Sequence, residues 1–166
     1  MSYRLITNRA AQMPGDYKPQ NNTTDTNCCV WQTAHRLHIR IDGPAPGKPR
    51  MTQRDRWKNR PCVMRYREWC DRVRAVVGNQ LPPATDVQSL SWIAYYTPAK
   101  SWSQKKKNGV MGRLHRARPD RDNIDKAVLD CLYKEDSAIA KGTIKKVWSE
   151  EASIVIEIVT LAGDDQ

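Results

Sequence analysis

The sequence has 166 residues, enough for one domain with a modest hydrophobic core. Its 28 lysines and arginines outnumber the 18 acidic residues, and the net charge of +10 indicates a polyanionic partner such as nucleic acid or an anionic membrane surface. Residues 1–17 contain no apolar stretch and no run is long enough to cross a bilayer, so we exclude a membrane-spanning protein and expect a cytoplasmic location without a membrane partner.

The first half of the chain is predicted to hold two regular elements after a polar start. Residues 1–32 are rich in Asn, Thr and Gln and are interpreted as a flexible amino-terminal extension, which leaves 33–162 as the folded domain. Alternation of Leu37, Ile39 and Ile41 with charged residues predicts a strand at 34–41. Apolar residues at helical spacing predict a helix at 62–77, before two prolines.

The second half is predicted to add three strands and one helix. Period-2 alternation predicts a strand near 89–96, and a long polar loop follows at 97–119. The remaining predictions are a helix at about 122–133 and two strands, which we expect to form a closing hairpin, near 142–148 and 152–160. This order predicts an α+β fold, a two-layer sandwich of a mixed four-stranded sheet with helices packed on one face. The five cysteines contain no CxxC pair and are expected to be reduced.

Most of the positive charge lies in two segments. Residues 48–74 hold ten lysines or arginines against three acids, and the loop 97–119 holds seven and no acid. Two such clusters repel themselves unless a polyanion binds, which favours DNA over a pair of solvated loops. The side chains that we expect to contact DNA are Lys48, Arg50, Lys100, Trp102, Lys105, Lys106, Lys107, Arg113, His115 and Arg118.

Acidic residues gather in the segment RPDRDNIDK at 118–126 and just after it. Residues 120–136 contain six of the 18 acids. If the backbone stays extended through Arg121, Asp120 and Asp122 point to the same side, and Lys126 lies one turn beyond Asp122 on the helix that follows. An Asp at a helix start often serves only as an N-cap, and an Asp–Lys pair one turn apart is a common surface motif.

Capping does not explain why so many acids gather in a basic chain. Two carboxylates ~4 Å apart repel by about 4 kcal/mol at an effective dielectric of 20, and a raised pKa or a hard divalent cation relieves this. Carboxylate oxygens with open water positions suit Mg²⁺. On a basic surface of DNA-binding character, such an ion indicates phosphodiester cleavage, with Lys126 placed to stabilise the charge that develops.

Four pieces of the sequence resemble the RusA family of Holliday junction resolvases, many of them encoded by phages or prophages. They are GKPR at 47–50, KSWSQKKK at 100–107, RPDRDNIDKAVLD at 118–130 and EDS at 135–137, and KKVW at 145–148, which contains Lys146, also fits. The resemblance implies a Mg²⁺-dependent homodimer that nicks opposed strands of a four-way junction in a bacterial host cell. It also implies that Asp120, Asp122 and Asp136 hold the metal, that Lys126 assists catalysis and that Lys146 contacts DNA.

Two alternatives remain open at this point. The span between Asp130 and Asp136 is shorter than in typical family members, so Glu135 or Glu157 could replace Asp136 as the third ligand. The function could also be that of a less selective nuclease for branched DNA, or of a basic DNA- or RNA-binding protein whose acids only cap a helix. No small-molecule substrate is expected.

Overall fold

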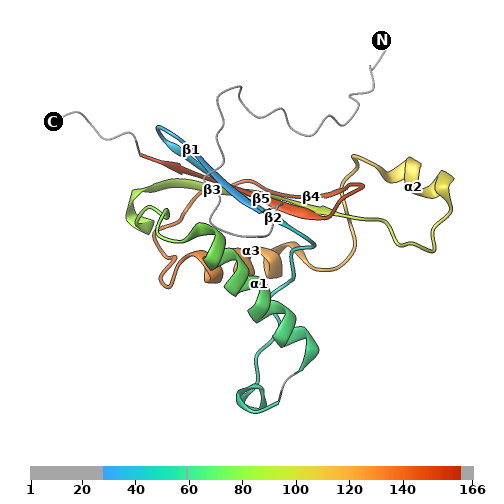
Figure 1. Cartoon of the computed structure of the whole chain (residues 1–166), viewed down its shortest axis with the longest axis horizontal. Helices are drawn as coiled ribbons and strands as arrows, with labels where there is room; N and C mark the ends of the chain where they lie inside the picture. The colour runs from blue at the N-terminus through green and yellow to red at the C-terminus, as the bar shows by residue number, and fades with distance from the viewer. Residues whose placement is uncertain (1–27, 59, 162–166) are drawn as a thin grey trace, which may run out of the picture.

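The computed structural model describes residues 28–58 and 60–161. These residues form a mixed sheet with two helices, α1 and α3, on one face (Figure 1). The predicted α+β fold is therefore confirmed, although the sheet has five strands where four were expected. The strands are β1 (Cys29–Thr33), β2 (Arg36–Asp42), β3 (Val87–Tyr96), β4 (Ile144–Trp148) and β5 (Ser153–Thr160), and the α-helices are α1 (Pro61–Val77), α2 (Gln104–Val110) and α3 (Arg121–Leu132).

The strands follow the order β1-β2-β5-β3-β4 across the sheet. β5 is antiparallel to both of its neighbours, and β4 pairs with β3 in parallel. The expected hairpin between the last two strands is therefore wrong. Ile154, Ile156 and Ile158 of β5 are fully buried, which suits a central strand, whereas β4 is short and carries two lysines, which suits an edge.

β1 is an edge strand that the sequence did not predict. It pairs with β2 in antiparallel fashion across a turn at residues 34–35. Gln32 and Thr33 are exposed and the strand has no alternating apolar pattern, so residues 29–32 read as part of the polar extension. Residues 1–27 of that extension lie outside the described residues.

The hydrophobic core lies between the sheet and the two helices. Alternate residues of β2, β3 and β5 point into it, and α1 and α3 each bury one face at helical spacing. Burying each large apolar side chain contributes about 1.5–3 kcal/mol. The fully buried members with the largest side chains are Trp92, Leu37, Ile39, Ile41, Ile124, Ile154, Ile156, Ile158, Val63, Val73, Val77 and Val128.

A disulfide between Cys70 of α1 and Cys131 of α3 joins the two helices. The prediction of reduced thiols is therefore wrong for this pair. The two cysteines are 61 residues apart in the sequence, and only the packing of α1 on α3 brings their Cα atoms to 5.0 Å. The bridge fixes α3, which carries most of the acidic motif, against α1.

α2 lies inside the segment predicted to be a loop. The Ser103 hydroxyl caps it by accepting a hydrogen bond from the backbone N–H of Lys106 at 3.4 Å. The helix buries no residue, so it carries no apolar stripe that could have predicted it. None of the helices formed by the described residues is long and apolar enough to cross a membrane.

Candidate active site

The acidic motif lies at the amino-terminal end of α3. Asp120 occupies the N-cap position with extended backbone dihedral angles of −69° and 146°, and Arg121 is the first helical residue. The helix therefore starts one residue earlier than predicted, and the backbone is not extended through Arg121. Asp120 and Asp122 flank this first helical residue, so both carboxylates belong to the same helix end, where the dipole favours negative charge.

Simple helix capping does not account for Asp120. Its side chain makes no capping hydrogen bond, although it stands at the N-cap position. Asp120 is exposed, and so is the side chain of Asp122, at 64%. Both carboxylates are therefore accessible from solvent.

Asp122 pairs with Lys126 one helical turn away. The Lys126 Nζ donates to Asp122 Oδ2 at 3.2 Å, as the spacing predicted. This ammonium, followed by the backbone N–H groups of Asn123 and Asp122, holds the pKa of Asp122 below its ordinary value. Asp122 therefore stays charged into acid solution. The pair is exposed on both sides and contributes little to stability, so both groups can take other partners.

The third acid of the motif, Asp125, serves the core. Its Oδ1 accepts a hydrogen bond from the indole Nε1 of Trp92 at 2.8 Å. Trp92 is only 1% exposed and lies in the middle of β3. This contact holds the start of α3 on the sheet, and it thereby helps to position the exposed carboxylates of Asp120 and Asp122.

A second loop packs against the same helix end. The backbone N–H of Lys48 donates to the carbonyl oxygen of Asn123 at 2.8 Å. A Cβ atom at Gly47 would lie 3.1 Å from the Pro119 side chain and 3.2 Å from that of Asn123, so the close approach favours glycine. The Lys48 ammonium pairs with Asp130, which also accepts from the Tyr66 hydroxyl. Lys48 is thus already engaged with an acid.

Lys146 and His115, which were both expected to contact DNA, lie near the backbone that leads to Asp120, and Lys146 holds that backbone directly. The Lys146 Nζ donates to the carbonyl oxygens of Ala117 and Pro119, both at 2.7 Å. Burial lowers the pKa of Lys146, and the charge of Asp120 partly opposes this shift. His115 is buried, and burial, together with the charge of Lys146, lowers its pKa.

His115 belongs to a run of stacked rings. Its ring centroid lies 4.5 Å from that of Tyr96 and 4.2 Å from that of Trp148. Trp148 in turn contacts Trp102, with ring centroids 5.3 Å apart, and the Lys106 Nζ lies 3.8 Å from the Trp102 ring centroid. These rings connect the basic segment around α2 to the sheet.

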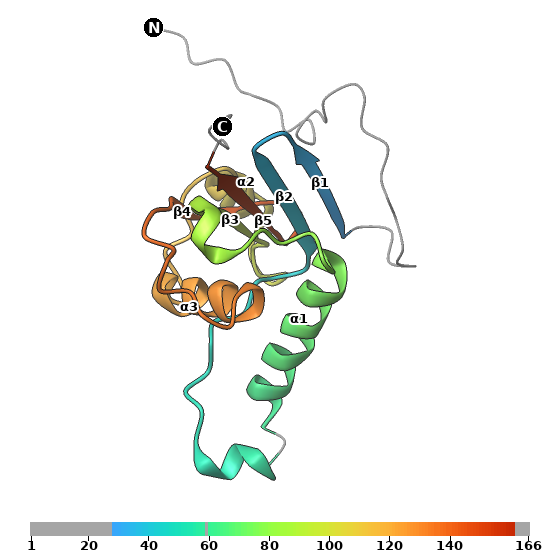
Figure 2. The same ribbon diagram turned by 90° about the vertical axis from the view of Figure 1, so that its left-hand side faces the viewer.

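The remaining predicted DNA contacts are exposed. In the part of the chain that the structure describes, none of them forms an ion pair with an acid; they are Arg50, Lys100, Lys105, Arg113 and Arg118. Lys107 donates to the carbonyl oxygen of Lys100 at 3.1 Å. The segment between β2 and α1 extends away from the sheet (Figures 1 and 2), and Arg50 belongs to this segment by sequence.

Asp136 lies at the other end of α3 from Asp120 and Asp122. α3 has 12 residues and is therefore about 18 Å long, and Asp136 follows its opposite end. Glu135 there accepts from the backbone N–H of Ser137 at 3.4 Å. Glu157 pairs with Arg36 at 2.8 Å, and it alternates with the buried isoleucines of β5, so it lies on the other face of the sheet. Among the described residues, no three His, Cys, Asp or Glu side chains form a group that could hold a metal.

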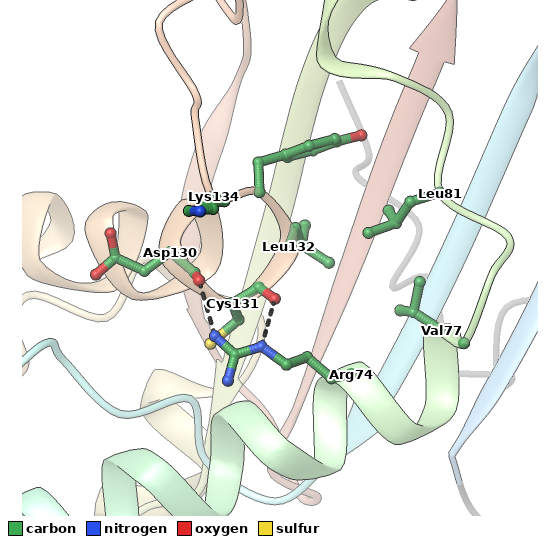
Figure 3. Close-up of a pocket in the computed structure, with 9 residues that line it drawn as sticks. Arg74, Val77, Leu81, Asp130, Cys131, Leu132 and Lys134 are labelled. Atoms are coloured by element: carbon green, nitrogen blue, oxygen red, sulfur yellow. Dashed lines mark hydrogen bonds between the residues drawn. The ribbon is translucent and has the colours of Figure 1, made fainter.

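A cavity of about 520 Å³ lies at the carboxyl-terminal end of α3, between that helix and α1 (Figure 3). Arg74 donates there to the carbonyl oxygens of Asp130 at 3.1 Å and Cys131 at 3.2 Å. These carbonyls belong to the last turn of the helix, where no intrahelical donor remains. The role of Arg74 is thus to cap α3, at the end of the helix that is far from Asp120 and Asp122.

The comparison with known families covers most of the described chain. The model of the family endodeoxyribonuclease RusA matches residues 46–159, a span that starts at the loop against Asn123 and includes the whole of α3. No curated protein matches the chain. The matched span contains Asp120, Asp122 and Lys126, as well as the basic segment around α2. The chain belongs to the RusA endodeoxyribonuclease family.

Proposed function

We propose that this protein is a Mg²⁺-dependent endodeoxyribonuclease that resolves four-way DNA junctions by paired nicks. One observation carries the proposal: Asp120 and Asp122 present two exposed carboxylates at one helix end within the span that matches the family. Exposed lysines and arginines without acid partners among the described residues lie in segment 97–119, which directly precedes Asp120. Family membership supplies the DNA substrate and the reaction class.

The donor set at this helix end fits a Mg²⁺ ion that is shared with the substrate. Mg²⁺ is commonly held by one or two carboxylates together with phosphate oxygens and water, and not by a protein cage. Asp120 and Asp122 supply the two carboxylates, so a third protein ligand is not required. When bound, the ion would offset negative charge on the phosphoryl oxygens and make the attacking water easier to deprotonate.

The chain's own residues have separate tasks in this proposal. Asp120 and Asp122 would hold the ion, while Lys126 leaves its pairing with Asp122 to stabilise the charge that develops at the reacting phosphate. Lys146 positions Asp120 by holding the carbonyl oxygens of the residues before it. Asp125 anchors the helix start through Trp92.

We assign DNA binding to the exposed basic residues of the two segments 48–74 and 97–119, which precede the acids in the sequence. Lysines and arginines there would neutralise phosphates and release counterions, so affinity should fall steeply with salt. Trp102 is half-buried, and the Lys106 ammonium lies over its ring. These contacts read the backbone of DNA and not its sequence.

We also propose a homodimer as the active form. A four-way junction has two-fold symmetry, and paired nicks need two equivalent active sites. Each protomer would contribute one pair of exposed carboxylates, Asp120 and Asp122 at the start of α3. Two copies related by a two-fold axis would place one such pair at each of two opposed strands.

The test compares an end-labelled four-way junction with a linear duplex of the same arm sequence, each with and without Mg²⁺. We expect symmetric nicks in opposed strands of the junction, dependence on Mg²⁺, and at least about tenfold slower cutting of the duplex. Equal cutting of both substrates would indicate a less selective nuclease. Tight binding without any cutting would indicate a binding protein.

A further inference from the structure

A second cavity lies directly beside the acidic helix end. Its volume is about 580 Å³, and it is lined by the loop Pro44–Gly47, by α1, and by Tyr96 and Pro119. The Tyr96 hydroxyl fixes the loop by donating to the carbonyl oxygen of Ala45 at 2.8 Å. Pro119 immediately precedes Asp120, so this cavity adjoins the proposed active site, unlike the cavity that Arg74 lines.

Two nitrogen donors on the lining side chains have no partner. Trp69 is 3% exposed, and its Nε1 is buried without a hydrogen bond; the Nε of Arg72 is buried and unpartnered as well. A buried donor left without an acceptor costs about 1–3 kcal/mol, and both of these donors belong to residues that line the cavity. Both groups donate hydrogen bonds and cannot accept them.

The charges on the lining also favour an anion. Arg65 and Arg72 are two guanidinium groups against the one carboxylate of Glu68. Within the described residues, neither arginine forms an ion pair. The Arg72 guanidinium lies beside Gly43, because its Nη2 is 3.5 Å from where a Cβ would stand at that residue, whose φ is +88°.

We propose that this cavity binds a phosphodiester group of the DNA strand, next to the phosphate that is cut. Arg65 and Arg72 contact its oxygens, and guanidinium groups match phosphate geometry through paired hydrogen bonds. Trp69 also lines the pocket. The inference rests on the proposed function, because DNA held at Asp120 must pass the adjoining wall. The two arginines are then positioning residues that fix the register of the strand.

The first experiment measures junction affinity in EDTA at several salt concentrations, so that cutting does not contribute. Arg72→Gln and Arg65→Gln should each weaken binding about tenfold and make the slope of log K against log salt shallower by about 1. Glu68→Gln should tighten binding, because a repulsive charge leaves the cavity. Lys141→Gln, the matched loss of one exposed cation on the segment before β4, should change affinity less than about twofold.

The second experiment locates the phosphate. Single phosphates near the nick are replaced by neutral methylphosphonates, and each modified junction is bound by wild type and by Arg72→Gln. At one position, the methylphosphonate should weaken junction binding by the wild-type protein about tenfold. Binding by Arg72→Gln should be nearly unaffected at that position, because the substitution and the methylphosphonate remove the same contact. Arg72→Lys should keep part of the affinity, and thermal melting followed by circular dichroism shows whether each variant is folded.

The outcomes separate this inference from the proposed function. If wild type nicks junctions but folded Arg65→Gln and Arg72→Gln bind with wild-type affinity and salt slope, the cavity assignment is overturned and the nuclease assignment stands. If both variants lose affinity and the methylphosphonate effect appears, while wild type fails to nick, the cavity assignment stands and the nuclease assignment falls.

Discussion

Replacing Asp122 by Asn is expected to lower the rate of junction nicking at saturating DNA at least about 100-fold. In the proposed function, the substitution removes one of the two carboxylates that would hold the ion, and metal stabilisation of phosphoryl charge is worth several kcal/mol, at 1.36 kcal/mol for each tenfold in rate. Junction affinity in EDTA should be unchanged or higher, since a negative charge beside phosphate is lost. Asp120→Asn should behave in the same way. Single-turnover cleavage and binding isotherms measure the two effects.

Asp125→Asn is the matched control within the same motif. Asp125 accepts a hydrogen bond from Trp92, and the amide oxygen of Asn can still accept it. We therefore expect nicking within about threefold of wild type and a folded protein. Nicking by Asp122→Asn near the wild-type rate would contradict the assignment of the metal-binding carboxylates. Equal losses in Asp122→Asn and Asp125→Asn would instead indicate a general effect on the helix.

Replacing Trp92 by Ala is expected to lower the free energy of unfolding by about 3–5 kcal/mol. Trp92 is 1% exposed on β3, paired with Ile156 on one side and Ile144 on the other. The substitution leaves a cavity in the centre of the core and removes the indole donor to Asp125, which lies 2.8 Å away. Urea unfolding followed by far-ultraviolet circular dichroism measures the change.

Trp92→Phe separates the effect of the lost packing from the effect of the lost hydrogen bond to Asp125. The ring still fills much of the space, whereas the N–H donor is lost and Asp125 is left without its partner. We expect a loss of about 1–3 kcal/mol for this variant. A loss below about 1 kcal/mol for Trp92→Ala would contradict the view that this residue anchors the first turn of α3 to the sheet.

The parts of the fold that could be predicted from the sequence are those with a strong apolar period. Leu37, Ile39 and Ile41 alternate with charged residues, and β2 lies where the alternation predicted it. α1 and α3 likewise lie within one or two residues of the predicted ranges. The order of strands could not be predicted, because β5 alternates like any half-buried strand and its central place depends on which neighbours it pairs with.

The short elements carry no such pattern. β1 is polar at one end and α2 buries nothing, so only their hydrogen bonds define them. The Cys70–Cys131 pair depends on how two helices cross and cannot be inferred from spacing alone.

The sequence predicted where the acids gather but not what each of them contacts. The Asp122–Lys126 pair follows from helical spacing, and the structure has it. The contact between Asp125 and Trp92 spans 33 residues, and the burial of His115 between two rings depends on tertiary packing. The cavity beside Pro119 also depends on tertiary packing, so the sequence did not predict it. From the sequence alone, Arg65 and Arg72 are ordinary charged residues on an amphipathic helix.

The most direct test of the metal assignment is the binding of Mn²⁺, a paramagnetic substitute for Mg²⁺, followed by electron paramagnetic resonance. The wild-type complex with a junction is compared with the complex of the Asp120→Asn, Asp122→Asn double variant. We expect bound Mn²⁺ in the wild-type complex and its loss in the variant that still binds DNA. Equal Mn²⁺ occupancy in the two complexes would show that Asp120 and Asp122 do not hold the metal.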